Sequence, residues 1–381
     1  MNRKRTVLTL VIAAGLIALG LWRWRDRQPQ TAGHILIAAN LPLSGPLATY
    51  GAAVREGATL ALEDSKGGAA PIEVDWQDNA SDPKTAVSIL RKQLLRDPTI
   101  YVSGVKPQTM AIKDELSRLS LPHFVWVFDA VINQNSSNNF RTWVSYKIEP
   151  PVYTKYAQDR QAKRIAVTYV QLPHTIEEFE KILVPELKAK GADVFVEPYD
   201  FGRTDFKDIA AKMAAFKPDL IILNGFQGDL VGLIRSLRPL GAITDGNTIA
   251  TYDLLDAAKI LGPDETEGIR IVAPLFETRP DDATIADWRR RFHLKYGRAP
   301  LYTHAFAHDM ISAIRVAAAS APHPASNDDW IKALRGVNVQ GITGPIRFDS
   351  DGDMLTPLEV GVYRGGRLIP DQAIQSSAPS K

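Results

Sequence analysis

Ile35–Asn40 reads ILIAAN and opens the series of short β-rich runs that decides the fold. Similar runs follow at Ile72–Trp76 (IEVDW), Ile100–Gly104 (IYVSG) and Phe124–Val127 (FVWV), separated by amphipathic stretches such as Lys84–Arg96. Apolar runs of this length, alternating with helix-like segments, indicate a buried parallel sheet with helices on both sides. The first third of the chain therefore predicts one doubly wound α/β lobe.

The same pattern repeats further along the chain. Its strand-like runs are Ile165–Val170, Val194–Val196, Leu220–Asn224, Thr248–Thr251 and Arg270–Ala273, and its helix-like segments are Ile176–Lys190, Phe206–Phe216 and Asp229–Arg238. Two such series predict an α/β protein with two doubly wound parallel-sheet lobes. Parallel sheets bind ligands beyond the carboxyl ends of their strands, so two facing lobes would hold a ligand between them.

Composition excludes several kinds of protein. The 381 residues suit two domains, and the absence of cysteine excludes disulfides, thiolate metal sites, a cysteine nucleophile and a lipid-modified cysteine. The formal net charge is +2, but residues 1–33 carry six basic side chains and only one acidic one. The remaining body is therefore slightly acidic, which argues against nucleic acid as a partner.

The N-terminal segment predicts export. Met1–Arg5 is basic, and Val7–Trp22 is an apolar run followed by cationic and Trp residues. One interpretation is a signal peptide removed near Ala18-Leu19-Gly20. The other is a membrane anchor formed by residues 7–22, followed by a polar tether to residue 33. Both place the body in the periplasm, either soluble or tethered to the inner membrane. At the other end, residues 371–381 are expected to form a flexible tail.

Motifs for catalysis or cofactor binding are absent from the sequence. No G-x-G-x-x-G, G-x-x-x-x-G-K-[ST] or G-x-S-x-G occurs, so we expect neither an enzyme nor a cofactor. His304 and His308 have a metal-like spacing without a third ligand, and Asp349, Asp351 and Asp353 lack the later Glu of a calcium loop. We therefore predict no metal site and interpret Asp351-Gly352 as the turn of a hairpin whose second strand is Leu358–Tyr363.

Four segments carry a family resemblance: Leu41–Gly51 (LPLSGPLATYG), Asp78–Ala86 (DNASDPKTA), Asp219–Gly241 (DLIILNGFQGDLVGLIRSLRPLG) and Gly341–Gly352 (GITGPIRFDSDG). In their order and spacing they resemble the type I periplasmic solute-binding proteins, in particular the leucine/isoleucine/valine-binding family of ABC importers. The resemblance runs from about His34 to Pro370. It implies the two-lobe fold of that family, with three chain crossings that form a hinge.

On this resemblance the chain divides at the three crossings, near Tyr146–Tyr153, Ala273–Arg279 and Val337–Gly341. Lobe 1 would comprise residues 34–150 and 275–339, and lobe 2 residues 151–274 and 340–370. The implied function is capture of a small organic ligand, such as an amino acid, an amide or a related metabolite, and its delivery to the membrane subunits of an ABC permease. The alternative is a membrane-tethered sensing or scaffold module with the same fold.

The resemblance also implies ligand contacts in lobe 1. Ser44 and Tyr50 stand where the family has a serine and an aromatic residue, and Thr109 is the hydroxyl that survives in the second loop. Asp129 departs from the small residues usual in the third loop and would repel a ligand carboxylate unless Lys106 neutralises it. These departures suggest a ligand other than a simple aliphatic amino acid.

In lobe 2 the implied contacts are His174, Phe226, Tyr252 and Asp253. Asp253 stands where the family places an acidic residue that holds the ligand ammonium group. The alternative for Asp253 is an ordinary helix N-cap. An apolar or cation-holding wall would be formed together by Tyr50, Phe128, Phe226 and Tyr252, and the alternative for these aromatic residues is an ordinary place in the core.

Overall fold

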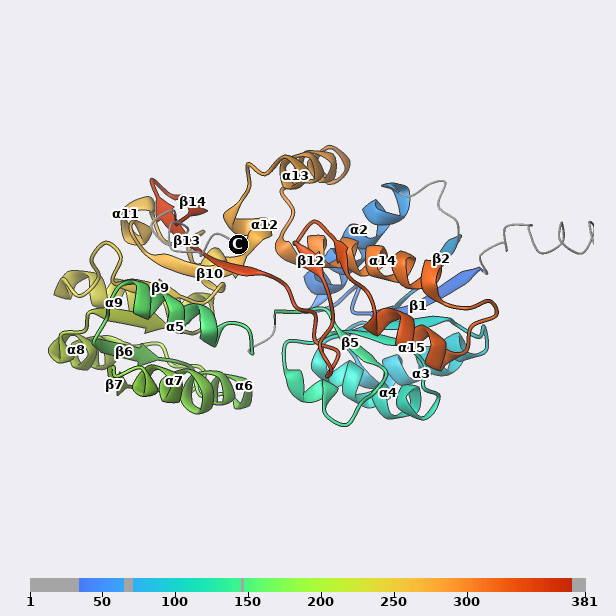
Figure 1. The fold of residues 1–381 in the computed structure, drawn as a ribbon, viewed down its shortest axis with the longest axis horizontal. Helices are drawn as coiled ribbons and strands as arrows, with labels where there is room; N and C mark the ends of the chain where they lie inside the picture. The colour runs from blue at the N-terminus through green and yellow to red at the C-terminus, as the bar shows by residue number, and fades with distance from the viewer. Residues whose placement is uncertain (1–33, 65–70, 145–146, 372–381) are drawn as a thin grey trace, which may run out of the picture.

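The computed structural model describes residues 34–64, 71–144 and 147–371. They form two lobes that lie side by side, each built around its own sheet (Figure 1). The first sheet has five parallel strands in the order β2-β1-β3-β4-β5, and the second has seven in the order β14-β13-β10-β9-β8-β6-β7. The prediction of two lobes with parallel sheets is therefore confirmed.

The first lobe is a doubly wound sheet. Its strands are β1 (Ile35–Leu41), β2 (Ile72–Asp78), β3 (Ile100–Gly104), β4 (His123–Trp126) and β5 (Asn139–Arg141). Its helices are α2 (Ala48–Asp64), α3 (Pro83–Leu94), α4 (Lys106–Arg118), η1 (Ala130–Asn133), α13 (Ala283–Tyr296), α14 (Tyr302–Ser320) and α15 (Asn327–Arg335).

Alternate residues of β1 show how this sheet buries both faces. Ile37 and Ala39 pack with α2 and α14, whereas Ala38 between them packs with α3 and α4. A strand turns successive side chains to opposite faces, so an unbroken apolar run is what a sheet covered on both sides requires. This is why the run at 35–40 predicted the architecture correctly.

The second lobe follows the same plan. Its strands are β6 (Arg164–Thr168), β7 (Asp193–Val196), β8 (Leu220–Leu223), β9 (Thr248–Ala250), β10 (Arg270–Pro274), β13 (Leu358–Arg364) and β14 (Arg367–Pro370). Its helices are α5 (Pro150–Asp159), α6 (Pro173–Thr175), η2 (Ile176–Leu183), α7 (Val184–Ala189), α8 (Lys207–Phe216), α9 (Gln227–Leu237), η3 (Arg238–Leu240), α10 (Leu254–Ala257), α11 (Pro263–Thr266) and α12 (Leu275–Thr278).

Two details of the second lobe differ from the sequence prediction. The single helix expected at Ile176–Lys190 is a π-helix, η2, that continues into α7 at Val184. The strand β13 does not pair with residues 346–348 as a hairpin. It runs antiparallel between β10 and β14, and Gly365 and Gly366 turn the chain at positive φ. Phe348 pairs instead with Met354 in a tighter turn.

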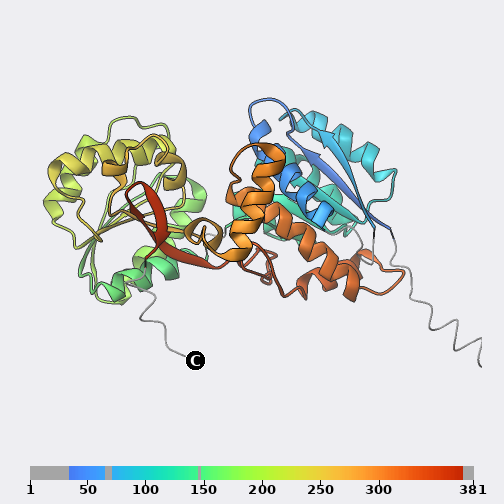
Figure 2. The same ribbon diagram turned by 90° about the horizontal axis from the view of Figure 1, so that it is seen from above.

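The third crossing lies later than expected, so residues 340–354 belong with the first lobe. The short strands β11 (Val339–Gln340) and β12 (Pro345–Ile346) pair with each other. Between them, the backbone N–H groups of Ile342 and Thr343 donate to the buried carboxylate of Asp309 on α14, both at 2.8 Å. The chain joins the second sheet only at Leu358, as the strand that links the lobes in Figure 2 shows.

A buried ion pair fixes the same segment to the first lobe. Asp353 accepts from Arg141 at the end of β5, at 2.7 Å from Nε and 2.9 Å from Nη2. Both side chains are almost fully buried. The hydrogen-bonded anchors at Asp309 and Arg141 therefore explain why the segment does not leave the lobe near residue 340.

The other boundaries also differ in detail. The second crossing falls between α12, which contacts β10 and β13, and α13, which packs on the first lobe. Asp371, expected in the flexible tail, accepts a hydrogen bond from Arg270 Nε at 2.8 Å.

The predictions for residues 1–33 and 372–381 lie outside the described residues. Within the described ranges, no helix has the length and apolar character needed to cross a membrane.

Candidate functional site

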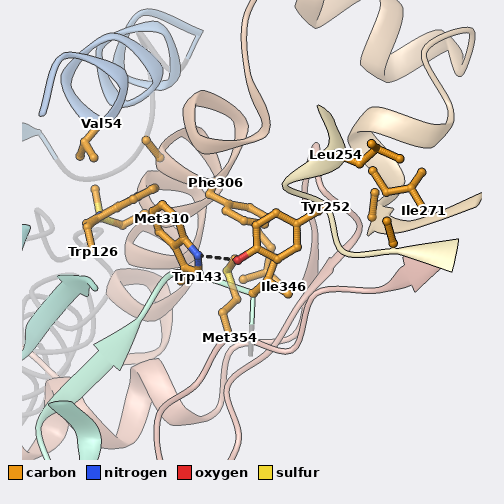
Figure 3. Packing of buried hydrophobic residues seen from close by; sticks show 14 of the residues in the cluster. Val54, Trp126, Trp143, Tyr252, Leu254, Ile271, Phe306, Met310, Ile346 and Met354 are labelled. Carbon is orange, nitrogen blue, oxygen red and sulfur yellow. Dashed lines mark hydrogen bonds between the residues drawn. The ribbon is translucent and has the colours of Figure 1, made fainter. Parts of the chain in front are cut away.

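The carboxyl ends of the two sheets face each other, and side chains from both lobes meet there. Phe128, just beyond β4, lies with its ring 4.4 Å from the ring of His174, which follows β6. Trp143, just beyond β5, donates from Nε1 to the hydroxyl of Tyr252 at the end of β9, at 3.2 Å (Figure 3). Two of the expected lobe 2 residues are therefore brought against lobe 1.

Tyr302 at the start of α14 completes this contact. Its ring centroid lies 5.7 Å from that of Tyr252 and 6.2 Å from that of Trp143, in edge-to-face arrangements. Phe306, Met310 and Met354 lie around the rings of Trp143 and Tyr252 (Figure 3). We call the five rings of Phe128, Trp143, His174, Tyr252 and Tyr302 the interlobe aromatic cluster.

Burial keeps the imidazole in this cluster neutral. It lowers the pKa of His174 to about 4, and the positive charges of Lys106 and Arg141 act in the same direction against the opposing effect of Asp129. His174 therefore presents an uncharged ring to Phe128 near neutral pH.

Asp129 and Lys106 form an ion pair, which is the arrangement needed for Lys106 to neutralise the charge of Asp129. The distance from Lys106 Nζ to the Asp129 carboxylate is 2.6 Å. Burial would raise the pKa of Asp129, but the hydrogen bond from Lys106 and another from the backbone N–H of Val131 hold it below its ordinary value. The pair is therefore electrically neutral as a unit and does not confront a ligand carboxylate with an unpaired negative charge.

Asp253 lies directly after Tyr252, at the N-cap position of α10. Its side chain caps no backbone N–H, so the helix-cap interpretation does not account for it. It accepts one hydrogen bond, from Thr251 Oγ1 at 3.3 Å. Burial raises the pKa of Asp253 to about 7, and the negative charges of Asp256 and Asp229 add to this effect. The carboxyl group is poised to ionise near neutral pH.

Two further carboxylates, which sequence reasoning missed, accompany Asp253. Glu149 precedes α5 in the first crossing and, like Asp253, caps no helix N–H with its side chain. Glu178 lies on the π-helix η2 and is 4% exposed. We call Glu149, Glu178 and Asp253 the carboxylate trio.

The members of the carboxylate trio act on one another. Burial raises the pKa of Glu149 to about 8, with the negative charge of Asp253 as the second cause. Burial likewise raises the pKa of Glu178 well above its ordinary value, and the charges of Glu149 and Asp253 raise it further. The three side chains come from the hinge, from η2 and from the residues after β9, and burial is the largest cause of the raised pKa of each.

Several expected residues lie at strand ends but remain exposed. Ser44 is exposed in the loop after β1, where Asp78 accepts from its backbone N–H at 3.1 Å. The Tyr50 side chain is 52% exposed on the first turn of α2. In lobe 2, Phe226 precedes α9 and meets the exposed ring of Phe201 edge-on at 5.8 Å. Exposed aromatic rings of this kind are common at ligand and partner contacts.

Thr109, unlike these exposed residues, lies in the interior of the first lobe. Its side chain is fully buried, and its hydroxyl is 2.9 Å from the hydroxyl of Ser103, which in turn lies 2.8 Å from His123 Nε2. The hydroxyl expected to meet a ligand is therefore engaged inside the first lobe.

The histidines and aspartates considered as metal ligands have structural partners. His304 and His308 on α14 face Glu56 and Asp64 on α2, at 3.3 and 3.2 Å. No group of three potential ligands for a metal ion occurs among the residues that the structure describes.

A family model described as periplasmic binding protein matches residues 34–367, nearly all of the described chain. The chain belongs to this family. It is a solute-binding protein of the periplasm, with the type I fold.

Relatives by sequence are similar over almost their whole length. The Leu/Ile/Val-binding protein homolog 1 of Brucella melitensis is 23% identical over 376 residues, which cover 93% of this chain and 94% of that protein. The Leu/Ile/Val-binding protein of Citrobacter freundii is 24% identical, with 95% and 97% covered.

Solved structures support the fold. A putative branched-chain amino acid ABC transporter protein from Rhodospirillum rubrum superposes with a TM-score of 0.77 at 20% identity, covering 88% of this chain and 99% of that one. A solute-binding protein from Rhodopseudomonas palustris in complex with benzoate gives a TM-score of 0.69 at 17% identity, covering 89% and 96%.

Proposed function

We propose that this protein captures a small organic ligand between its two lobes and delivers it to the membrane subunits of an ABC permease. One observation carries the proposal. Asp253 follows Tyr252 of the interlobe aromatic cluster, at the facing ends of both sheets, and its carboxylate does not cap the helix that it precedes. Such a combination suits a ligand that has an apolar body and a polar group at a fixed position. The relatives, named as binding proteins for amino acids, support the same type of ligand.

We further propose that Tyr50, Phe226 and Ser44 contact the ligand when the lobes close. All three are exposed at strand ends, and none is needed by the core of its own lobe. Thr109 is left out of this proposed set because its hydroxyl is engaged in the interior. A binding protein gains from such exposed groups because the ligand stabilises the closed arrangement in which they become buried.

The two proposed roles, a soluble carrier and a tethered sensing module, differ in whether the mature protein is attached to the membrane. Residues 1–33 would either be removed on export or be retained as an anchor. N-terminal sequencing of the exported protein separates the two: a start beyond Gly20 supports a soluble carrier, and an intact Met1 supports a tethered module.

Thermal unfolding in the presence of a metabolite library tests the binding function. A ligand at a hundredfold excess over its Kd stabilises the folded state by about 2.7 kcal/mol. We expect a shift with one chemical class and its loss in Asp253→Asn. Asp264→Asn is the matched control, because Asp264 lies on the nearby helix α11 and is exposed. Absence of any shift across amino acids, amines, amides and aromatic acids would contradict the proposal.

A further inference from the structure

Phe201, in the loop between β7 and α8, carries the most exposed aromatic ring among the described residues, at 67%. Its ring meets that of Phe226 edge-on at 5.8 Å, and Phe226 is itself 39% exposed. Gly202 follows at a positive φ of 87°, with open space around it. A pair of rings held in water forgoes the stabilisation that burial would give, which points to a contact that they make in another state of the protein.

The loop that holds Phe201 folds back across the carboxyl end of the second sheet. Strand β6 separates β7 from β8, yet two contacts join the loop after β7 to the residues after β8. Tyr199 donates from its hydroxyl to the carbonyl oxygen of Asn224 at 2.8 Å, and Phe201 touches Phe226. A Cβ atom at Gly225 would lie 2.1 Å from the Tyr199 hydroxyl oxygen, so a larger residue there would displace Tyr199. The position of Phe201 is therefore fixed by a hydrogen bond and by close packing.

An aromatic ring follows each of four neighbouring strands in this lobe. In sheet order these are Tyr252 after β9, Phe226 after β8, His174 after β6 and Phe201 after β7. Neighbouring strands lie about 5 Å apart, so the row spans roughly 14 Å along the edge that faces lobe 1. Lobe 1 contacts Tyr252 and His174, while Phe226 and Phe201 remain exposed. The row is longer than a branched-chain amino acid and suits a ligand with a bulkier apolar body.

Phe128 brings a further exposed ring from lobe 1 to the middle of this row. It is 36% exposed, and its ring lies 4.4 Å from that of His174. Because His174 follows β6, Phe128 approaches lobe 2 between the strands that precede Phe226 and Phe201. Aromatic rings favour edge-to-face and offset-stacked neighbours with centroids about 4.5–7 Å apart. Three phenylalanine rings are thus available to a ring on a ligand that lies between the lobes.

We propose that the ligand carries an aromatic ring and that Phe201 is a specificity-determining residue, which packs against that ring with Phe226 and Phe128 when the lobes close. The inference rests on the proposed function and names its ligand class. Closure brings lobe 1 against the edge where Phe201 lies, and the exposed pair continues the interlobe aromatic cluster along that edge. An aliphatic side chain fills apolar space there, whereas an aromatic ring also gains ring–ring contacts.

Matched probes separate a ring–ring contact from simple burial of apolar area. Isothermal titration of the full exported protein compares phenylalanine with 3-cyclohexylalanine, and benzoate with cyclohexanecarboxylate, beside leucine and any ligand found in the thermal screen. We expect the aromatic member of at least one pair to bind more tightly than its saturated analogue. Phe201→Leu should lower the affinity for the aromatic probe by about fivefold, which corresponds to one ring–ring contact, and should reduce its advantage over the analogue.

Leu240→Ala is the matched control, because Leu240 is 51% exposed and lies on η3, at the other end of α9 from Phe226. We expect this control to bind every probe as the unchanged protein does. Both substituted side chains are exposed, so thermal unfolding without ligand should be unchanged in both variants. If Phe201→Leu does not fold, the paired probes on the unchanged protein still decide.

The outcomes separate this inference from the proposed function. Equal binding of both members of each pair overturns the inference, as does an unchanged affinity for the aromatic ligand in Phe201→Leu. Binding of leucine, or of a library compound without an aromatic ring, while no aromatic compound binds, overturns the inference and leaves the binding function standing. Absence of binding by all probes and by the metabolite library overturns both.

Discussion

At the residue scale, the site depends on carboxyl groups that burial keeps protonated. Asp253 and Glu149 have pKa values raised from 3.8 and 4.5 to about 7 and 8. Both groups stand at helix N-cap positions, and neither side chain caps its helix. The sequence pointed to Asp253 through its family position. It did not distinguish the buried Glu178 from Glu177 and Glu180 beside it, because the tertiary packing of the segment decides which of these side chains is buried.

These raised pKa values predict how stability changes with pH. Between about pH 4.5 and 8 the folded protein holds protons on the trio that the unfolded chain has released, so the free energy of unfolding falls as pH rises through this window. Below about pH 4 the contribution is fully present. Buried histidines with lowered pKa values act mainly below pH 6.5, and in the opposite direction.

Chemical denaturation at pH 5 to 8.5 checks this prediction. We expect the decline in unfolding free energy to be shallower in Glu178→Gln than in the unchanged protein, since Gln does not titrate. Glu177→Gln should keep the full decline. Parallel curves for all three proteins would show that Glu178 is ionised in the folded state and would contradict the account.

A second prediction concerns the buried pair of Arg141 and Asp353. Asp353→Asn keeps the shape of the side chain but leaves the guanidinium buried without its counter-charge. Removing one partner of a buried ion pair costs about 3–5 kcal/mol. Glu115→Gln removes the exposed partner of Arg118 and should cost little, because exposed ion pairs contribute about 0–1 kcal/mol. Equal unfolding free energies for the two variants would contradict the structural role given to Asp353.

At the element scale, alternation of strands and helices was predictable and the crossings between lobes were only partly so. The apolar runs of β1, β3 and β8 predict strands that are buried on both faces, and every residue of these strands is buried in the structure. The family resemblance predicts the third crossing near Val337–Gly341, whereas the structure has it before Leu358. Asp309, far away in sequence, accepts from the two N–H groups that hold the following loop on lobe 1.

The packing of α2 on α14 yields a prediction at this scale. A Cβ atom added at Gly57 would lie 2.0 Å from the carbonyl oxygen of His304, so the helices must separate to admit it. We expect Gly57→Ala to destabilise the protein by about 1–3 kcal/mol, as overpacked cores do. Gly228 on α9 has open space at the same position, and Gly228→Ala should be neutral or stabilising by about 0.4–1 kcal/mol. Thermal unfolding of both variants measures the difference, and equal stability would contradict the close approach.

At the scale of the whole molecule, the two lobes meet through aromatic rings rather than through a continuous sheet. The crossings and the interlobe aromatic cluster join them, and exposed rings such as Tyr50 and Phe226 remain at the facing strand ends. A ligand that contacts both lobes will favour a closed arrangement by its differential affinity. The family resemblance predicted this organisation, and the facing sheet ends explain it physically.

The central claim is that the ligand is captured between the lobes, and the distance between two spin labels tests it. Because the chain has no cysteine, labels attach only at introduced cysteines. Thr49→Cys on α2 and Lys207→Cys on α8 would place one spin label on each lobe, near the ends of β1 and β7, at exposed positions. A second pair, Thr49→Cys with Arg91→Cys, lies within lobe 1 and serves as the control. Double electron–electron resonance should show the interlobe distance shorten and narrow when the ligand from the thermal screen saturates the protein, while the control distance stays unchanged. An interlobe distance that does not change at saturation would contradict capture of the ligand between the lobes.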